Sequence, residues 1–329
     1  SDTTVSPRAS SVVSMKKWVK GNQAGDPATT DDDLGVLNVA AGGSAAACAP
    51  RTAGVTDGPF YTYPCAPITR PGGEETWRLD FLNTGNTNAK VVAAIDTLPA
   101  VGDRGVIDNS ARGSQFAVSL IGRASANLGA LADGANATLQ MYYSATVQSQ
   151  TCNQNAVEVY TSNASPNPAC AFDWQPFDAS TPESTLSGAR SVLAVVTFAN
   201  PDGVKPGRGL HPGETLRLTF DTRTPAALPA DSAAASGAPV AYNSFAGSSR
   251  TVATTTQAER GEIVLGPQKV GVASATGQLQ LDKVVVSPDF ASPITLPTAF
   301  PMLVTCTSAG QSVTLRYANG ADASRVTVP

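Results

Sequence analysis

The strict alternation of apolar and polar residues in the segment Glu-Thr-Trp-Arg-Leu-Asp-Phe limits the possible fold more than any other feature. Trp77, Leu79 and Phe81 are separated by single polar residues, so an extended chain has one apolar and one wet face here. This period of two is typical of a half-buried β-strand. The Asn-Thr-Gly-Asn sequence at 83–86 favours a turn, and a second apolar run follows at 91–95. The pattern predicts a hairpin of two strands, as found in antiparallel sandwiches.

Short apolar runs between turn residues predict further strands along the chain. They lie at 11–20, 115–121, 138–147, 156–161, 191–198, 215–220, 240–244 and 262–272. No stretch shows the 3.6-residue periodicity of an amphipathic helix, and charged residues make up only 15% of the chain. The expected fold is therefore all-β, an antiparallel β-sandwich.

The composition also limits the class of function. With 42% hydrophobic residues among 329, the chain can form a substantial core, and its net charge of −4 comes without a basic stripe for nucleic acid. The one histidine, His211, lies in a Gly-Leu-His-Pro-Gly turn, and no Gly-x-Ser-x-Gly or phosphate-binding loop occurs. The carboxylates at 31–33 lack the spacing of a calcium loop. We expect no enzyme, no cofactor and no metal.

Five cysteines indicate the compartment. Cys48 with Cys65, and Cys152 with Cys170, would each close a short segment. A single histidine argues against zinc, so we expect two disulfides and an exported protein; free buried thiols are the alternative. Cys306 is left over, as a free thiol, in an intermolecular bond, or with a partner outside this chain.

A short internal sequence repeat, called the echo below, gives information about the domain organisation. The Gly-Glu-Glu-Thr-Trp-Arg-Leu-Asp-Phe sequence at 73–81 recurs as Gly-Glu-Thr-Leu-Arg-Leu-Thr-Phe at 213–220. The two copies fit either two homologous domains or two strands of one domain, and we favour one domain. We expect a flexible leader (1–10), a large β-sandwich with long disulfide-closed loops (11–272), and a small β domain that is possibly truncated (277–329).

Several of these motifs together resemble a known class of protein. A Gly-Glu-Thr strand, the Asn-Thr-Gly turn and the Asp-Thr-Leu-Pro sequence at 96–99 resemble the extracellular modules of bacterial, actinobacterial-type surface adhesins and pilin-like proteins. A late Pro-Gly-Glu-Thr strand at 212–215 and the Asn-bearing strand at 241–245 fit the same modules. The Val-Thr-Cys-Thr strand at 304–307 is similar to the start of a small Ig-like surface repeat.

The resemblance implies an Ig-like sandwich in a non-catalytic, structural or adhesive segment of an exported cell-surface protein. It implies an extracellular or cell-wall location, with attachment through parts outside this chain. We expect a monomeric fragment of a longer protein, with no membrane span of its own and an unidentified host or surface ligand, protein or glycan. The loops at 21–73 and 148–190 are the expected ligand-facing surface.

The resemblance further implies an internal isopeptide bond. Such modules join a buried lysine to an asparagine beside a buried carboxylic acid. Strand parity places Lys17, Asn243 and Glu75 on core-facing positions, which makes them the candidates. In the alternative interpretation, Lys17 and Glu75 lie at strand ends and reach water. Lys283, with Asn319 or a residue beyond the chain, is a second and weaker candidate pair.

The alternative function is a carbohydrate-binding or accessory module of an exported enzyme. Exposed aromatic rings would distinguish it, because sugars stack on such rings. Trp174 and Phe177 are the candidate ligand-contact residues, and Trp18 is a further ring to consider.

Overall fold

The computed structural model describes the greater part of the chain. The described residues are 10, 12–23, 35–48, 60–106, 109–147, 173–200, 207–228, 238–252, 261–264, 266, 268–275, 300–303, 306–308, 311–313 and 325–328. The fold is nearly all β, as predicted from the alternation of apolar and polar residues.

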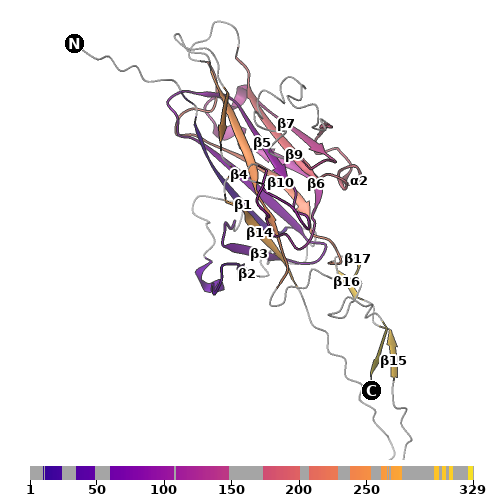
Figure 1. Cartoon of the computed structure of the whole chain (residues 1–329). Coiled ribbons are helices and arrows are strands. Elements are labelled where there is room, and N and C mark those ends of the chain that lie inside the picture. Colours follow the sequence, from indigo (N-terminus) through magenta and orange to yellow (C-terminus); the bar gives the residue numbers. More distant parts are fainter. Residues whose placement is uncertain are drawn as a thin grey trace, which may run out of the picture.

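Three sheets, named here after a central strand, form the sandwich (Figure 1). The β4 sheet has the order β1 (Val13–Gln23), β4 (Glu74–Asn83), β10 (Thr215–Arg223), β6 (Ser119–Ala126). The β5 sheet has the order β13 (Gly261–Val264), β12 (Phe245–Thr251), β5 (Ala89–Thr97), β9 (Ser191–Phe198), β7 (Ala137–Ser144), β8 (Gln175–Phe177). The β14 sheet has the order β11 (Val240–Asn243), β14 (Val270–Ser274), β3 (Cys65–Thr69), β2 (Val36–Asn38). The strands pair antiparallel, apart from the parallel pair β14 and β3.

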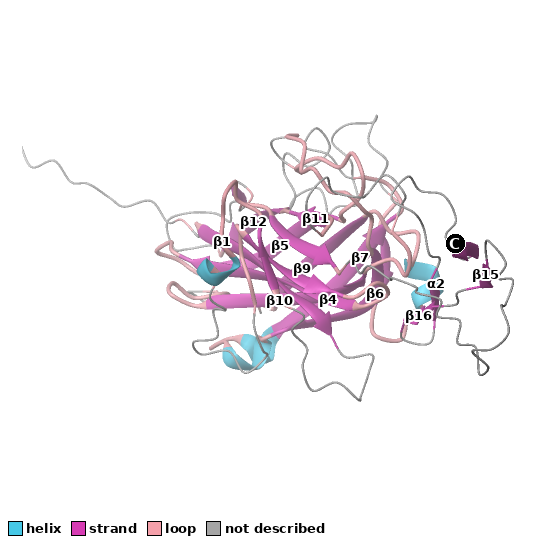
Figure 2. Ribbon diagram, turned by 90° about the horizontal axis from the view of Figure 1, so that it is seen from below, coloured by secondary structure: helices cyan, strands magenta, loops and turns pink. Residues whose placement is uncertain are grey.

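Helical structure is scarce in the described part of the chain. It consists of α2 (Glu183–Leu186) and the 3₁₀ turns η1 (Ala45–Ala47), η2 (Leu128–Ala130) and η3 (Gly134–Asn136). Figure 2 shows the strands grouped together, with the short helical turns at the periphery. None of the helices described here has both the length and the apolar character needed to cross a membrane.

The main core lies between the β4 sheet and the β5 sheet. Trp77 and Phe81 from β4 meet Ala94 from β5 and Phe245 from β12 in one buried cluster. The rings of Phe81 and Phe245 pack edge to face, with centroids 5.4 Å apart, a favoured geometry for aromatic pairs. The alternation that predicted β4 therefore also identified its core-facing side.

The β5 strand is buried on both faces. Val91, Ala93 and Ile95 point away from the main core but lie under Val106 and Trp174 in a second buried cluster. A strand covered on both sides shows no polar alternation, which explains its continuous apolar run.

The predicted hairpin between the Trp77 strand and the Val91 strand is wrong. The β4 strand pairs with β1 and β10, whereas β5 pairs with β12 and β9 in the other sheet. The turn at 83–86 thus carries the chain between layers instead of reversing it within one sheet. The two echo segments are neighbouring strands, because Leu218 of β10 lies opposite Leu79 of β4.

The region 21–73 is more than a loop excursion. It contains β2 and β3, which pair with each other and extend the β14 sheet. Cys48 and Cys65 form the predicted disulfide, which closes the segment between η1 and β3. Cys152 and Cys170 lie outside the described residues, as do most of the predicted leader, the predicted strand at 156–161 and the carboxylates at 31–33.

Other predicted strands differ mainly in their bounds. The strand expected at 115–121 begins later, as β6, and the one expected at 262–272 is two strands, β13 and β14. Toward the C-terminus, β15 (Phe300–Leu303) pairs with β18 (Arg325–Val328), and β16 (Cys306–Ser308) pairs with β17 (Gln311–Val313). Cys306 opens β16, and its side chain is outside the described set.

Close approach of the two main sheets depends on one glycine. A Cβ at Gly247 would lie 2.3 Å from Sδ of Met15 and 2.8 Å from Cε1 of Phe81. We predict that Gly247→Ala lowers the free energy of unfolding by about 1–3 kcal/mol, as overpacking of a core does. Urea denaturation measures the change.

Gly129→Ala is the matched control, because a Cβ there meets no atom within 4 Å. Its effect should stay within about 0.5 kcal/mol. Equal stability of the two variants would show that the sheets do not approach as closely as described.

Candidate functional site

Lys17 is a charged residue type in the middle of the apolar core. It lies on β1 on the same face as Val13 and Val19, as strand parity predicted, and is 1% exposed. Its Nζ lies 5.3 Å from the ring centroid of Trp77, 5.7 Å from that of Phe220 and 5.5 Å from that of Phe245.

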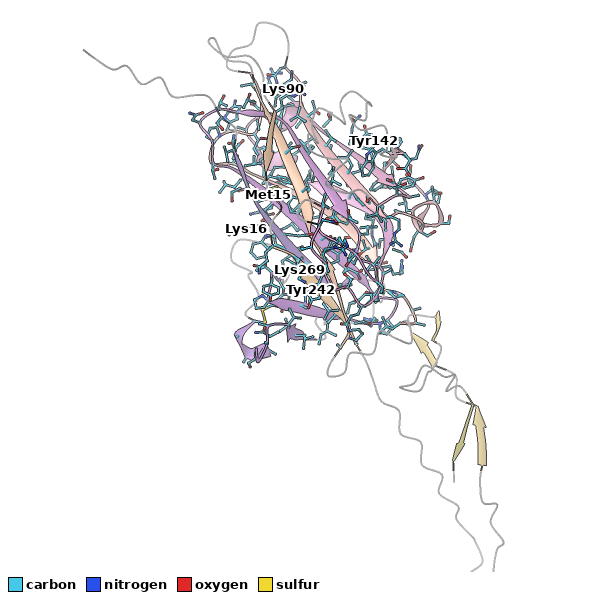
Figure 3. All side chains as sticks on the ribbon, viewed as in Figure 1. Met15, Lys16, Lys90, Tyr142, Tyr242 and Lys269 are labelled. Atoms are coloured by element: carbon cyan, nitrogen blue, oxygen red, sulfur yellow. A yellow bond between two sulfur atoms is a disulfide. The ribbon has the colours of Figure 1, made fainter. Side chains whose placement is uncertain are left out.

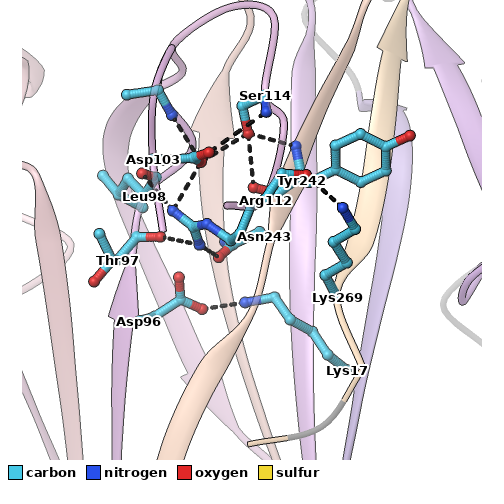
Figure 4. A network of polar contacts seen from close by, with 11 residues as sticks. Lys17, Asp96, Thr97, Leu98, Asp103, Arg112, Ser114, Tyr242, Asn243 and Lys269 are labelled. Atoms are coloured by element: carbon cyan, nitrogen blue, oxygen red, sulfur yellow. Dashed lines mark hydrogen bonds and ion pairs between the residues drawn. The ribbon is translucent and has the colours of Figure 1, made fainter. Parts of the chain in front are cut away.

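The partner of Lys17 is Asp96, near the end of β5. The Lys17 Nζ donates a hydrogen bond to Asp96 Oδ2, and both side chains are buried (Figure 4). Asp96 faces inward with Val92 and Ala94, on the opposite side of β5 from Ile95. The pair therefore joins the β4 sheet to the β5 sheet inside the sandwich.

Burial shifts both members of the pair toward their neutral forms. Desolvation lowers the pKa of Lys17 to about 8, against the opposing effect of Asp96, and the positive charge of Arg112 lowers it further. Desolvation raises the pKa of Asp96, against the opposing effect of Lys17. Both shifts increase the fraction of the neutral form of each group, and with a pKa of about 8 a minor fraction of Lys17 is the neutral amine at pH 7.

Asn243 completes the group. It ends β11, where the chain leaves the β14 sheet; β12 begins two residues later, with Phe245 opposite Asp96. This change of sheet places the Asn243 side chain next to the Asp96 carboxyl, and a hydrogen bond from it lowers the pKa of Asp96. Asn243 is fully buried.

Two atoms in this group lack a regular hydrogen bond. Within the described residues, Asn243 Nδ2 and Asp96 Oδ1 are buried and have no partner of good geometry. The interaction between the Asn243 side chain and the Asp96 carboxyl is therefore a distorted hydrogen bond, which is weaker than a well-aligned one.

The carboxamide oxygen of Asn243, in contrast, is held firmly. Arg112 Nη1 donates to Asn243 Oδ1 at 3.1 Å and to the carbonyl oxygen of Thr97 at 2.7 Å. Its Nη2 donates to the carbonyl oxygen of Leu98 at 3.1 Å and pairs with Asp103 Oδ2 at 2.9 Å (Figure 4).

Further contacts hold Arg112 and Asp103 in place. Ser114 Oγ donates to Asp103 Oδ2 at 2.7 Å and accepts from the Tyr242 backbone N–H at 2.8 Å. Lys269 donates to the Arg112 carbonyl oxygen (Figure 4). Its Nζ lies 4.3 Å from the centroid of the Tyr242 ring, and both residues are labelled in Figure 3. This network fixes the loop after β5 against the end of β11.

The arrangement supplies the groups for amide transfer. A neutral Lys17 amine is a nucleophile, the Asn243 carboxamide is an electrophile, and Asp96 can carry a proton between them. No group of three or more histidine, cysteine or acidic side chains suited to a metal ion occurs among the described residues.

The structure places two of the three predicted isopeptide residues together and corrects the third. Glu75 is not the acid beside Lys17. Its Oε1 accepts a hydrogen bond from Thr222 at 2.6 Å and its Oε2 accepts one from Thr224 at 3.0 Å. Thr222 accepts in turn from Trp77 Nε1 at 2.8 Å. Glu75 therefore belongs to a separate buried network between β4 and β10.

The candidate aromatic rings serve packing. Phe177 is 6% exposed and packs edge to face against Tyr143. Trp174 is partly buried against the outer cluster of β5. Trp18 is 7% exposed, with its Nε1 donating to Asp80 at 2.9 Å. Phe177 and Trp18 are therefore buried, whereas Trp174 keeps part of its surface exposed.

Other candidates lie elsewhere. His211 Nε2 contacts Asp133 Oδ2 at 2.8 Å in a partly exposed pair. Lys283 and Asn319 are outside the described residues.

Asp96 and Arg112 were not predicted as site residues. Asp96 belongs to the Asp-Thr-Leu-Pro sequence that carried the family resemblance, so this motif was the available signal. Parity could not select it, because β5 is apolar on both faces. Arg112 lies in a loop, where no periodic pattern reports burial.

Comparison with known proteins gives little guidance. No protein-family model matches the sequence, and no curated protein matches it. A solved structure titled "AvmM Catalyzes Macrocyclization in Alchivemycin A Biosynthesis" aligns with 65% of this chain and 87% of its own, at 12% identity and a TM-score of 0.21. A likeness at this TM-score supports no conclusion about function.

The Glu75 network predicts a pH dependence of stability. Burial raises the pKa of Glu75 to about 7 from an ordinary value of 4.5. A carboxyl that binds its proton more tightly when folded stabilises the fold at low pH, and this contribution is lost as pH rises through about 7. Between pH 4.5 and pH 8, the free energy of unfolding of the wild type should fall by about 3 kcal/mol relative to that of Glu75→Gln.

Urea denaturation of both proteins at a series of pH values checks this. Stability curves that run parallel across the whole range would show that Glu75 keeps an ordinary pKa in the fold.

Proposed function

We propose that this chain is a structural and adhesive segment of an exported bacterial surface protein, cross-linked internally by an isopeptide bond between Lys17 and Asn243. The observation that carries the proposal is the buried group of Lys17, Asp96 and Asn243 between the sheets. In this proposal the chain has no turnover activity, and the single reaction serves its own fold.

The reaction balances without any other reagent. The neutral Lys17 Nζ attacks Cγ of Asn243 and forms the new N–C bond. Protonated Asp96 delivers its proton to Nδ2 and takes a proton from Nζ, and the Cγ–Nδ2 bond then breaks. Ammonia leaves, and Asp96 ends in the protonation state in which it started.

The hydrogen-bonding pattern supports this direction of reaction. Asn243 Nδ2, the atom that would leave, is the atom of the carboxamide without a regular hydrogen bond. Only its distorted contact with Asp96 would have to be broken for it to leave. Lys17 would also lose its charge in the core, where a charge is costly.

The location of the bond supports a structural role. Lys17 lies on the first strand and Asn243 lies late in the sandwich, so the bond would close most of the domain into one covalent loop. The Cys48–Cys65 disulfide fastens β3 to the segment before it. A doubly cross-linked sandwich suits a protein exposed to proteases outside the cell. The surface location and the ligand of the adhesin are parts of the proposal and rest on the sequence resemblance.

The cross-link predicts a specific mass. After reduction and denaturation, the wild-type protein should weigh less than its sequence by one ammonia. Lys17→Met should have its full sequence mass, because methionine fills the same space without a nucleophile. Intact-mass spectrometry checks both, and tryptic peptides should contain a branched pair that joins the Lys17 region to the Asn243 region.

Lys16→Met is the matched control. Lys16 is the preceding residue on β1 and is exposed, so its variant should keep the ammonia deficit. A wild-type mass equal to that of the reduced sequence would refute the cross-link.

A further inference from the structure

We propose that Arg112 is a catalytic residue for this cross-link, in which its guanidinium polarises the Asn243 carboxamide and stabilises the negative charge that develops on Oδ1. The inference rests on the proposed function, because it concerns the same reaction. Asp96 would then transfer the proton, and Arg112 would stabilise the negative charge on Oδ1.

Arg112 touches the reacting atom directly. Its Nη1 lies 3.1 Å from Asn243 Oδ1, on the oxygen that becomes an oxyanion when Nζ attacks Cγ. Donors at this distance from a developing oxyanion are the usual means of stabilising a tetrahedral intermediate. The contact lies away from the surface, since Arg112 is 2% exposed and Asn243 is fully buried.

The guanidinium is held in place before the reaction. The carbonyl oxygens of Thr97 and Leu98 and the carboxylate of Asp103 accept from its two terminal nitrogens. Asp103 is itself held by Ser114 Oγ. A donor fixed in this way needs little reorganisation when charge develops. Such preorganisation accounts for much of the rate enhancement in electrostatic catalysis.

The contacts divide the work of Arg112 into two parts. Binding of the Thr97 and Leu98 carbonyls anchors the loop after β5, which is a structural task. Anchoring of this loop does not require the second bond of Nη1, which goes to Oδ1 of Asn243 on a different strand, β11. Because Oδ1 accepts from Arg112, Nδ2 is the carboxamide atom that interacts with Asp96 as a donor.

Arg112 also acts on the nucleophile. The charged groups that face Lys17 are Asp96 from β5 and Arg112 from the loop, and the other neighbours are the rings of Trp77, Phe220 and Phe245. The positive charge of Arg112 lowers the pKa of Lys17 and thereby increases the fraction of neutral amine. The positive charge of Arg112 thus makes Lys17 more often neutral and makes the Asn243 carboxamide more electrophilic.

The stepwise chemistry keeps Arg112 unchanged. The attack of Nζ moves the carbonyl π electrons onto Oδ1, where the N–H of Nη1 donates to the oxyanion. Collapse of the intermediate re-forms the C=O bond and expels Nδ2 as ammonia, with its extra proton supplied through Asp96. No proton is transferred from the guanidinium, which stays charged throughout.

The experiment follows the ammonia loss over time. Wild-type, Arg112→Gln and Arg104→Gln chains are made by cell-free synthesis, quenched in denaturant at intervals, and weighed after reduction. Arg112→Gln should form the cross-link about 10²–10³-fold more slowly, as expected for loss of an oxyanion donor. Arg104 is the matched control: it lies in the same loop, is exposed, and donates to the Asn109 carbonyl oxygen at 2.9 Å. Its variant should react at the wild-type rate.

The pH dependence separates a catalytic role from an anchoring one. Arg112→Lys keeps a positive charge beside Asp103, whereas Arg112→Gln removes it. Both variants are purified before cross-link formation is complete, and they are then incubated at a series of pH values. The rate of the Gln variant should reach its plateau at a higher pH, because the pKa of Lys17 is no longer lowered by a neighbouring cation. Superimposed profiles would show that the charge of Arg112 does not act on Lys17.

The outcomes distinguish the two proposals. A wild-type chain with no ammonia deficit refutes the cross-link itself. A cross-linked wild type, with a folded Arg112→Gln that reacts at the same rate, refutes only the role of Arg112. Folding is followed by circular dichroism and by protection of Cys48 and Cys65 from thiol reagents. If the Gln variant does not fold, Arg112→Lys decides the matter: a rate at least tenfold below wild type supports the role, and an equal rate overturns it.

Discussion

The contact between Lys17 and Asp96 is the interaction on which the interior of this sandwich depends. An ammonium among the rings of Trp77, Phe220 and Phe245 would be costly to bury, and removing its partner would leave an isolated charge. The structure meets this cost in two ways. It pairs the amine with a carboxyl on the opposing sheet, and it shifts both groups toward their neutral forms.

The rest of the site follows from where the chain changes sheets. The β11 strand ends at Asn243 in the β14 sheet, and β12 continues in the β5 sheet beside Asp96. This crossing brings a third sheet to the Lys17–Asp96 contact. Arg112 then fixes the crossing from outside, because one guanidinium contacts both the end of β5 and the side chain of Asn243. Three sheets and one loop therefore meet around the Asp96 carboxyl.

The sequence predicted the parts of this arrangement that depend on alternation. Strand parity placed Lys17 and Asn243 in the core, and local spacing paired Cys48 with Cys65. It placed Glu75 in the core as well, and Glu75 is fully buried. Parity cannot say which buried groups meet, however, because that depends on how sheets face each other. Glu75 thus contacts Thr222 across a strand pair, whereas Asp96 reaches Lys17 across the layers.

Asn243 is followed by β12, β13 and β14, and this order has a mechanical consequence. A pull on the two ends of the sandwich would enter at β1 and leave at β14. With the proposed bond in place, the chain from Lys17 to Asn243 would be bypassed, and it could not lengthen under tension. Only residues 244–274 would remain extensible, and drawn out fully they add roughly 100 Å. The domain would then act as an inextensible tether in series with one short yielding segment, formed by the strands β12 to β14.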